Sequence, residues 1–474
     1  MPKNSYFNSL LRPKSFRTGC FFALVTLVSG VIFVSGPFLS AVHAETLEEA
    51  LAEAYMSNPG LLAARAELRS VDEKMPQALS NYRPTISGAG SVGKANQSRS
   101  SAFFSANQNL TPLDGSISLT QPLYRGFRTV AETSEAENLV FAARADLADS
   151  EQAVLLDAIT AYMNVLRDQS VLDLNLKNEA VLTRELEATR DQFDVGELTR
   201  TDVSQAEARL ARGKADRIGS AGDLESSKAV YLRMIGQLPG TLVEPALVLD
   251  IPKDLEQALA LADANNPQIL SARYIYQAAK DSIQEAFGEL LPEVNLVGEV
   301  SRSRNSSSPG SSFDNMQVTA QLNMPLYQAG SVSSRVREAR QIAVQNRLEV
   351  EDARRAVREE TVTAWEALAT VRAQIESYEL EIKANKIALE GVREEETVGA
   401  RTVLDILNAE QEYLDSQVSL VSAMTDERIA AYELLGATGR LLAGYLDLPV
   451  RIYDEEKHYN AVRYKIWGTD TNND

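Results

Sequence analysis

Residues 192–203 read QFDVGELTRTDV, and residues 395–406, which lie 203 positions later, read EETVGARTVLDI. In both stretches a Val-Gly pair ends a long helical pattern, and glycine is the residue that best adopts a positive φ just past a helix end. Thr199 and Thr402 are then predicted to cap the next helix, each with an aspartate three residues on. The repeated helix–turn–helix pattern indicates an internal duplication, which decides the fold.

The duplication extends over most of the chain. Residues 46–51 and 58–59 match residues 208 positions later, whereas the Pro-Leu-Tyr at 122–124 matches one 203 positions later. The five-residue difference falls in a polar stretch, where loops tolerate changes of length. We therefore divide the chain into a signal peptide (1–44), a first repeat (45–245), a second repeat (246–445) and a C-terminal extension (446–474) to which we assign no role.

The first 44 residues resemble a secretory signal peptide. A basic start precedes an apolar run from about Cys20 to Val34, and Val42 and Ala44 fit the −3 and −1 positions of a cleavage site. A retained N-terminal anchor is the alternative. Cleavage would remove four basic residues and no acidic ones, so the formal net charge would change from −19 to −23.

The remaining composition excludes several functions. The mature chain would keep no cysteine and one histidine, His458, so we expect no disulfide, no Cys/His metal site, no cofactor and no Cys- or Ser-His catalysis. Its strong negative charge argues against binding to nucleic acid. We therefore do not expect an enzyme.

Each repeat has the same predicted order of elements. It begins with two helices, continues with two strands joined by a polar loop, and ends with a very long proline-free helix, the Val-Gly turn and a return helix. At 1.5 Å per residue, a long helix spans roughly 100 Å and must pack along another helix. The predicted ranges are about 46–56, 59–82, 84–125, 128–194 and 199–236 in the first repeat, and 254–264, 267–290, 292–327 and 331–396 before the second return helix.

Two periodicities support these elements. In the second long helix, apolar positions step alternately by four and three residues from Ala364 to Val392, a coiled-coil register. From Met316 to Leu326, apolar and polar residues alternate, as expected of a membrane strand with one wet face or of an ordinary amphipathic hairpin.

A closed β-barrel needs at least about eight strands, so one chain with four strands must share it with other chains. The strand count alone cannot choose between two and three chains.

The duplicated helices, the strand pairs between them and both tips resemble the TolC family of outer-membrane efflux channels. The resemblance covers about residues 45–445 and includes the Gln-Pro-Leu-Tyr junction at 121–124. It implies a mainly α fold with a β-barrel part: long antiparallel coiled-coil helices form a trimeric α-barrel below a shared 12-strand outer-membrane β-barrel, with four strands per chain.

The resemblance also implies a function. The protein would be a homotrimer in the outer membrane of a Gram-negative bacterium, in contact with outer-membrane lipid and extending into the periplasm. It would dock with a periplasmic adaptor (membrane fusion) protein and an inner-membrane transporter of the ABC, RND or MFS type. The duct would be passive and gated at its periplasmic tips, serving multidrug efflux or type I secretion of proteins. The alternatives are a periplasmic adaptor and a coiled-coil structural protein.

Some site residues follow from the matching motif positions. Asp405 falls on a family position that rings the narrow end of the pore, and Asn408 stands where the family often has a second acid. An acid in the first turn of a helix also stabilises the helix dipole, which would explain Asp405 without a pore.

The other site residues belong to a latch and to the tips. Arg401 matches a position that restrains the neighbouring hairpin, with Thr201 and Asp202 as its acceptors, and Glu396 stands where the family has a tyrosine. The predicted adaptor-docking tips are Val195 and Gly196 in the first hairpin and Val398 and Gly399 in the second.

Overall fold

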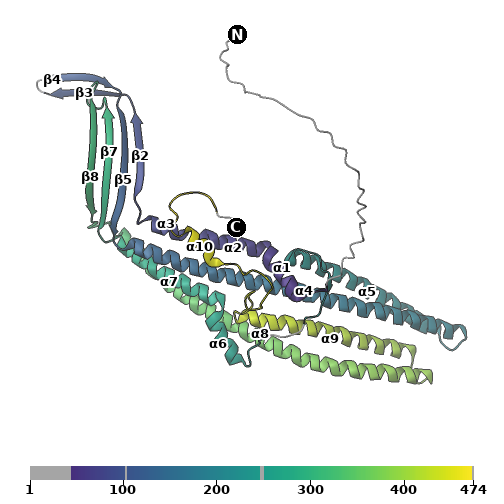
Figure 1. Ribbon diagram of the computed structural model, residues 1–474. Helices are drawn as coiled ribbons and strands as arrows, with labels where there is room; N and C mark the ends of the chain where they lie inside the picture. Colours follow the sequence, from purple (N-terminus) through teal and green to yellow (C-terminus); the bar gives the residue numbers. More distant parts are fainter. Residues whose placement is uncertain (1–43, 102–103, 246–249, 472–474) are drawn as a thin grey trace, which may run out of the picture. The chain divides into compact units, whose positions relative to one another are not determined.

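The computed structural model describes residues 44–101, 104–245 and 250–471. The predicted signal peptide lies, except for Ala44, outside the described residues. The helices are α1 (Leu47–Ser57), α2 (Pro59–Asp72), α3 (Lys74–Ser80), α4 (Arg128–Asp194), α5 (Arg200–Ile235), α6 (Leu255–Asn265), α7 (Pro267–Gly288), α8 (Ser331–Thr397), α9 (Val403–Ala437) and α10 (Glu455–Val462) (Figure 1). Apart from α3 and α10, the helices follow the order that was predicted for each repeat.

One predicted helix is broken. The sequence predicted a continuous helix over about 59–82, but it divides into α2 and α3 at Glu73. Pro76 explains the break, because proline has no N–H to donate to the carbonyl of Asp72 and its ring crowds that carbonyl. The corresponding helix in the second repeat, α7, has no internal proline and runs unbroken.

Four strands form one antiparallel sheet in the order β2-β5-β7-β8. The short β1 and β6 pair with each other in parallel, and β3 and β4 form a separate hairpin. The strands are β1 (Ala44–Glu45), β2 (Thr85–Val92), β3 (Ala95–Ser101), β4 (Phe104–Leu110), β5 (Leu113–Arg125), β6 (Thr241–Leu242), β7 (Glu293–Arg304) and β8 (Ser312–Asn323).

The β3–β4 hairpin replaces what the sequence suggested was a loop. Its Ser-, Asn- and Gln-rich strands carry no apolar period that could reveal them. Strand β8 also ends earlier than predicted, at Asn323 rather than near Leu326. Pro325 lies just beyond this end, but the equivalent Pro122 lies inside β5, where the register against β7 shifts, so proline alone does not explain the earlier end of β8.

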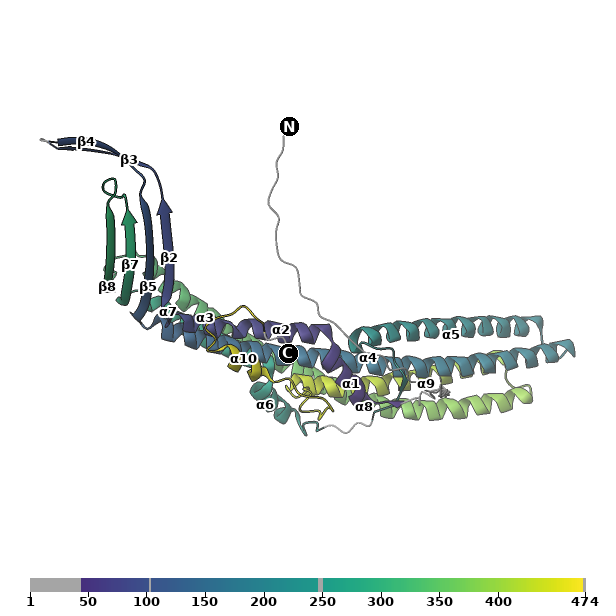
Figure 2. The ribbon, with the colours of Figure 1, turned by 45° about the horizontal axis from the view of Figure 1, so that its top comes forward.

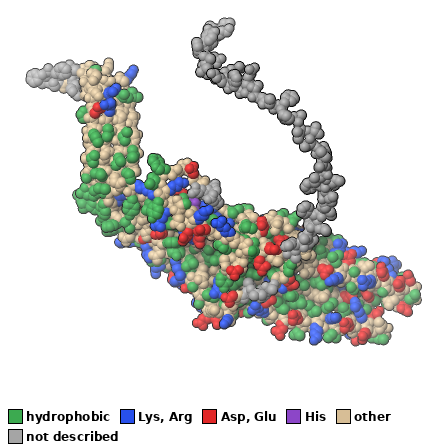
Figure 3. Space-filling model, in the orientation of Figure 1, with side chains coloured by type: hydrophobic (Ala, Val, Ile, Leu, Met, Phe, Trp, Pro, Cys, Tyr) green, Lys and Arg blue, Asp and Glu red, His purple; other side chains and the backbone are tan. Residues whose placement is uncertain are grey.

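The sheet has one apolar face. Ile86 pairs with Leu119, and Ile117 pairs with Val300, which in turn pairs with Met316. These side chains are exposed in the single chain, between 38% and 79% of their surface. Figure 3 shows hydrophobic side chains over the sheet, in contrast to the charged surface of the helices. The predicted alternation is therefore confirmed.

The long helices pack side by side as predicted. Helix α4 packs against α5, α8 packs against α9, and α7 packs against both α4 and α8 (Figure 2). The predicted coiled-coil positions of α8 are its less exposed face: Ala364, Leu368, Val371, Ile375, Tyr378, Ile382, Asn385, Leu389 and Val392 are all buried or half-buried.

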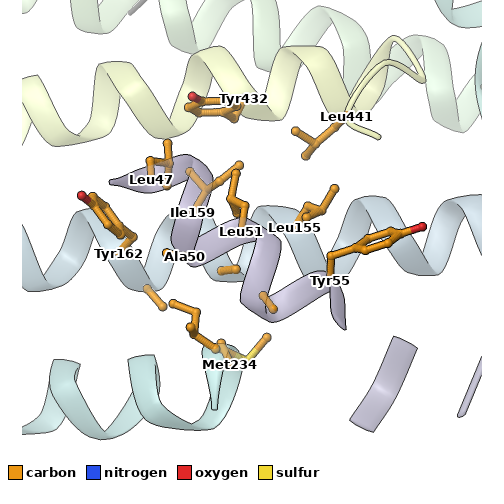
Figure 4. Close-up of a cluster of buried hydrophobic side chains, with 14 of the residues drawn as sticks. Leu47, Ala50, Leu51, Tyr55, Leu155, Ile159, Tyr162, Met234, Tyr432 and Leu441 are labelled. Atoms are coloured by element: carbon orange, nitrogen blue, oxygen red, sulfur yellow. The ribbon is translucent and has the colours of Figure 1, made fainter. Parts of the chain in front are cut away.

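The largest apolar core surrounds α1. Leu51 and Tyr55 from α1 meet Leu155 and Ile159 of α4, and side chains of α5 and α9 close the cluster (Figure 4). Each of these four named side chains is at most 2% exposed. This core fixes α4, from which the tip hairpin continues. Across the described ranges, no helix combines the length and apolarity needed to cross a membrane.

Candidate functional site: the two helical tips

Both long helices end in the same backbone motif. The N–H of Gly196 donates to the carbonyl of Phe193, and the N–H of Glu197 donates to the carbonyl of Gln192, each at 2.9 Å. This two-bond pattern is a Schellman motif. The second tip repeats it around Gly399, and the two glycines have φ of 86° and 77°. Any side chain at either glycine would strain the turn.

The return helices begin with the predicted capping boxes. In the first tip, the N–H of Thr199 donates to Asp202 Oδ2 at 2.9 Å, and the N–H of Asp202 donates to Thr199 Oγ1 at 3.4 Å. Thr402 and Asp405 form the same pair of bonds at 2.9 and 3.4 Å. The caps therefore hold both aspartates at fixed places on the tip surface.

The caps also keep both aspartates charged. Hydrogen bonds from the Thr199 side chain and backbone lower the pKa of Asp202. Bonds from the Thr402 backbone and side chain, with a smaller effect of the Arg401 charge, lower the pKa of Asp405. Each tip thus presents an ionised carboxylate at neutral pH.

An apolar cluster joins the two hairpins just behind the tips. We call it the tip cluster; its buried members are Leu182 and Leu186 of α4, Ala206 and Leu210 of α5, and Val403 and Leu407 of α9. Leu407 is 1% exposed and Val403 is 2% exposed. The second hairpin is therefore held against the first by burial of α9 side chains.

A polar bridge lies beside the tip cluster. Arg209 of α5 donates from Nη2 to Oδ1 of Asn408 on α9. Asn408 was predicted to line the pore constriction, and in the single chain it links the two hairpins. The sequence did not reveal Arg209 as its partner, because the two residues are 199 positions apart.

A buried carboxyl group, that of Glu410, lies on α9 about one helical turn beyond Leu407 of the tip cluster. Glu410 of α9 is 5% exposed and accepts a bond from Arg393 of α8, and its Oε2 has no hydrogen-bond partner among the described residues. Burial raises the pKa of Glu410, and burial with the nearby Glu410 charge raises the pKa of Glu185 on α4. Arg393 therefore compensates two carboxyls from different hairpins.

The predicted latch partners make other contacts within the single chain. Arg401 donates from Nε to Glu395 Oε2 at 2.8 Å, on its own hairpin. Asp202 is occupied by its cap with Thr199. Thr201 is exposed and Glu396 is half-buried. An Arg401–Asp202 latch therefore stays a prediction.

The extreme ends of both hairpins are apolar. Val195 is 73% exposed and Val398 is 79% exposed, each just before its turn glycine. Most of each valine surface is therefore open to solvent at the same place in both tips. These ends are the predicted docking positions.

Strands with one apolar face, joined to helices of 67 residues that each pack along a shorter return helix, fit the class of outer-membrane transport proteins. The chain belongs to the outer membrane efflux protein family, whose model matches residues 50–236 and 258–440. It is thus an outer-membrane efflux channel, and the adaptor and structural-protein alternatives are excluded. The family is one of channels rather than enzymes.

Its relatives agree with this assignment. The chain is 35% identical to the outer membrane efflux protein BepC of Brucella suis, over 95% of this chain and 98% of that protein. It is 28% identical to the outer membrane protein TolC of Vibrio cholerae, over 86% and 95% of the two chains. The crystal structure of the CmeC outer membrane channel of Campylobacter jejuni shares its fold, with a TM-score of 0.75 and 15% identity over 88% of this chain and 89% of that one.

Proposed function

We propose that three copies of this chain form one gated exit duct. The observation that carries the proposal is the sheet, which has an apolar face and ends in two edge strands, β2 and β8. An exposed edge strand presents unpaired N–H and C=O groups that another strand can satisfy. Pairing β8 of each copy with β2 of the next would close a sheet of three copies and leave no edge.

The helices support the same assembly. Helix α7 packs against both α4 and α8, whereas its counterpart in the first repeat, α2, packs against α4. Ile342, Val344 and Leu348 of α8 are 43–55% exposed. If neighbouring copies contact each other as the two repeats of one chain do, α2 of one copy would cover this part of α8 of the next, as α7 covers α4 within the chain.

The tips would then form the gate. Three copies of Asp405 near one axis would attract cations, and Asn408 would lie one helical turn behind them. Arg401 of one hairpin would restrain the next through Thr201 and Asp202, with Glu396 nearby. The exposed Val195 and Val398 would dock a periplasmic adaptor, which connects the duct to an inner-membrane transporter. The passenger would be a small molecule or a protein.

Disulfide trapping tests the assembly and the gate together. The sequence contains one cysteine, Cys20, within the predicted signal peptide, so introduced cysteines have no background. We expect oxidised Asp202→Cys/Arg401→Cys protein to run as covalent oligomers of up to three chains and to conduct poorly until reduced. Each single variant is the control. Native mass measurement of the detergent-extracted protein as one chain, or crosslinks within single chains only, would contradict the proposal.

A further inference from the structure

The C-terminal extension is fastened to the helices. His458 Nδ1 lies 2.9 Å from Oδ2 of Asp72, a residue of α2 that is 0% exposed. Tyr459 and Val462 of α10 are buried. Arg144 of α4 reaches Glu456 at 3.5 Å. These contacts fix where the chain leaves α10.

The next residues are pinned to the base of the sheet. The N–H of Lys465 donates to the carbonyl of Val462 at 2.9 Å, which turns the chain after α10. Arg83 Nη1 then donates to the carbonyl of Lys465, also at 2.9 Å. Arg83 lies two residues before Thr85, where β2 begins. Residues 464–467 are therefore held where the helices give way to the strands.

This segment, Tyr-Lys-Ile-Trp at 464–467, exposes its apolar side chains. Tyr464 is 68% exposed, Ile466 is 72% exposed and Trp467 is 88% exposed. Exposing three such side chains within four residues costs free energy, and the hydrogen bonds of the segment hold it in place. An apolar partner that covers these side chains would remove this cost.

Other exposed aromatic side chains lie at the same level. Tyr82, Phe127 and Tyr327 each follow or precede a strand at the end of the sheet nearest the helices, and they are 49%, 65% and 88% exposed. Beyond them the sheet presents its apolar face, and before them the helices are charged (Figure 3). Membrane proteins concentrate tryptophan and tyrosine at this transition, where the ring meets both headgroups and acyl chains.

The segment carries positive charge beside its exposed aromatic side chains. Residues 461–468 contain Arg463 and Lys465 and no acid, although Glu137 of α4 lies 3.8 Å from Arg463 and offsets part of this charge. Arg83 adds a third positive charge beside them. Basic side chains next to aromatic ones suit anionic phospholipid headgroups.

We propose that residues 464–467 are an interfacial anchor, which places Tyr464, Ile466 and Trp467 in the headgroup region of the periplasm-facing leaflet of the outer membrane. The anchor would tie the C-terminal extension, and through His458 and Asp72 the helix α2, to the membrane surface. It would fix the depth at which the sheet sits.

Tryptophan fluorescence tests the anchor directly. The chain has two tryptophans, Trp365 on α8 and Trp467, so Trp365→Phe leaves Trp467 as the sole reporter. The full-length protein would be reconstituted into vesicles of phosphatidylethanolamine and phosphatidylglycerol, with and without bromine on the upper part of the acyl chain. The matched control is Trp467→Phe, whose remaining Trp365 lies on the helical part of the chain.

Lipid contact would quench the emission of Trp467 on bromination and shift it to shorter wavelength than in the urea-unfolded protein. The control should lose no intensity with brominated lipid. Unquenched Trp467 that iodide quenches freely would place the segment in water and overturn the anchor. Unquenched Trp467 shielded from iodide would mean that protein, such as another copy of the chain, covers it, which would also overturn the proposal.

Discussion

Replacing Leu407 with alanine should loosen the second hairpin from the first. Leu407 is 1% exposed within the tip cluster, which α4, α5 and α9 build together. Removing a buried leucine costs about 2–5 kcal/mol. The site lies near the end of the hairpins, where the structure can relax, so we take about 2.5 kcal/mol from the lower part of that range. If opening separates α9 from the other two helices, the closed-to-open ratio falls about 70-fold.

Single-channel recording in planar bilayers measures this ratio as the fraction of time spent in high-conductance states. Leu404→Ala is the matched control, because Leu404 lies on the same turn of α9 but is 37% exposed. We expect Leu407→Ala to open far more often than wild type, and Leu404→Ala to change little. Equal gating in both variants, at an unchanged thermal midpoint, would refute the idea that the tip cluster holds the gate.

Three further predictions concern charge. Asp405→Asn keeps an acceptor for the Thr402 cap but removes the charge, so block of conductance by multivalent cations should weaken; unchanged block would remove Asp405 from the constriction. Burial and the neighbouring Glu285 raise the pKa of Glu135 to about 7 from 4.5, so the folded state holds a proton that the unfolded state releases, and stability falls as pH rises through that window. Glu135→Gln should therefore raise the thermal midpoint above pH 7 and leave it nearly unchanged below pH 4.5, as scanning calorimetry would show. His458→Ala should cost about 1–3 kcal/mol by leaving the buried Asp72 without that partner, and adding Asp72→Asn should restore part of the loss, which a thermal double-mutant cycle checks.

The sequence was sufficient for local structure. Caps, turn glycines and helix ends depend on residues within one turn of each other, so Thr199, Thr402 and both Val-Gly pairs lie where they were predicted. The heptad pattern of α8 and the alternation of β8 each report one buried or apolar face. Both patterns identify the buried or apolar face of an element without identifying the segment that packs against it.

Contacts between distant segments were not predictable in this way. Nothing near Arg209 indicates Asn408, and nothing near Glu185 indicates Glu410, because the partners are about 200 residues apart. The β3–β4 hairpin was missed because a polar hairpin leaves no hydrophobic period. One residue, Pro76, could have revealed the α2–α3 break, since proline inside a helical pattern predicts an interruption.

The pairing of β5 with β7 has a consequence for the descent of the molecule. It joins the last strand that the first repeat gives to the four-stranded sheet to the first strand of the second repeat, as the proposed junction would join β8 to β2 of another copy. A half-length ancestor with two strands and one hairpin could use that junction alone and close as a six-membered ring. Gene duplication and fusion would then free the halves to diverge. Such divergence would explain why the β3–β4 hairpin and the proline break between α2 and α3 occur only in the first half.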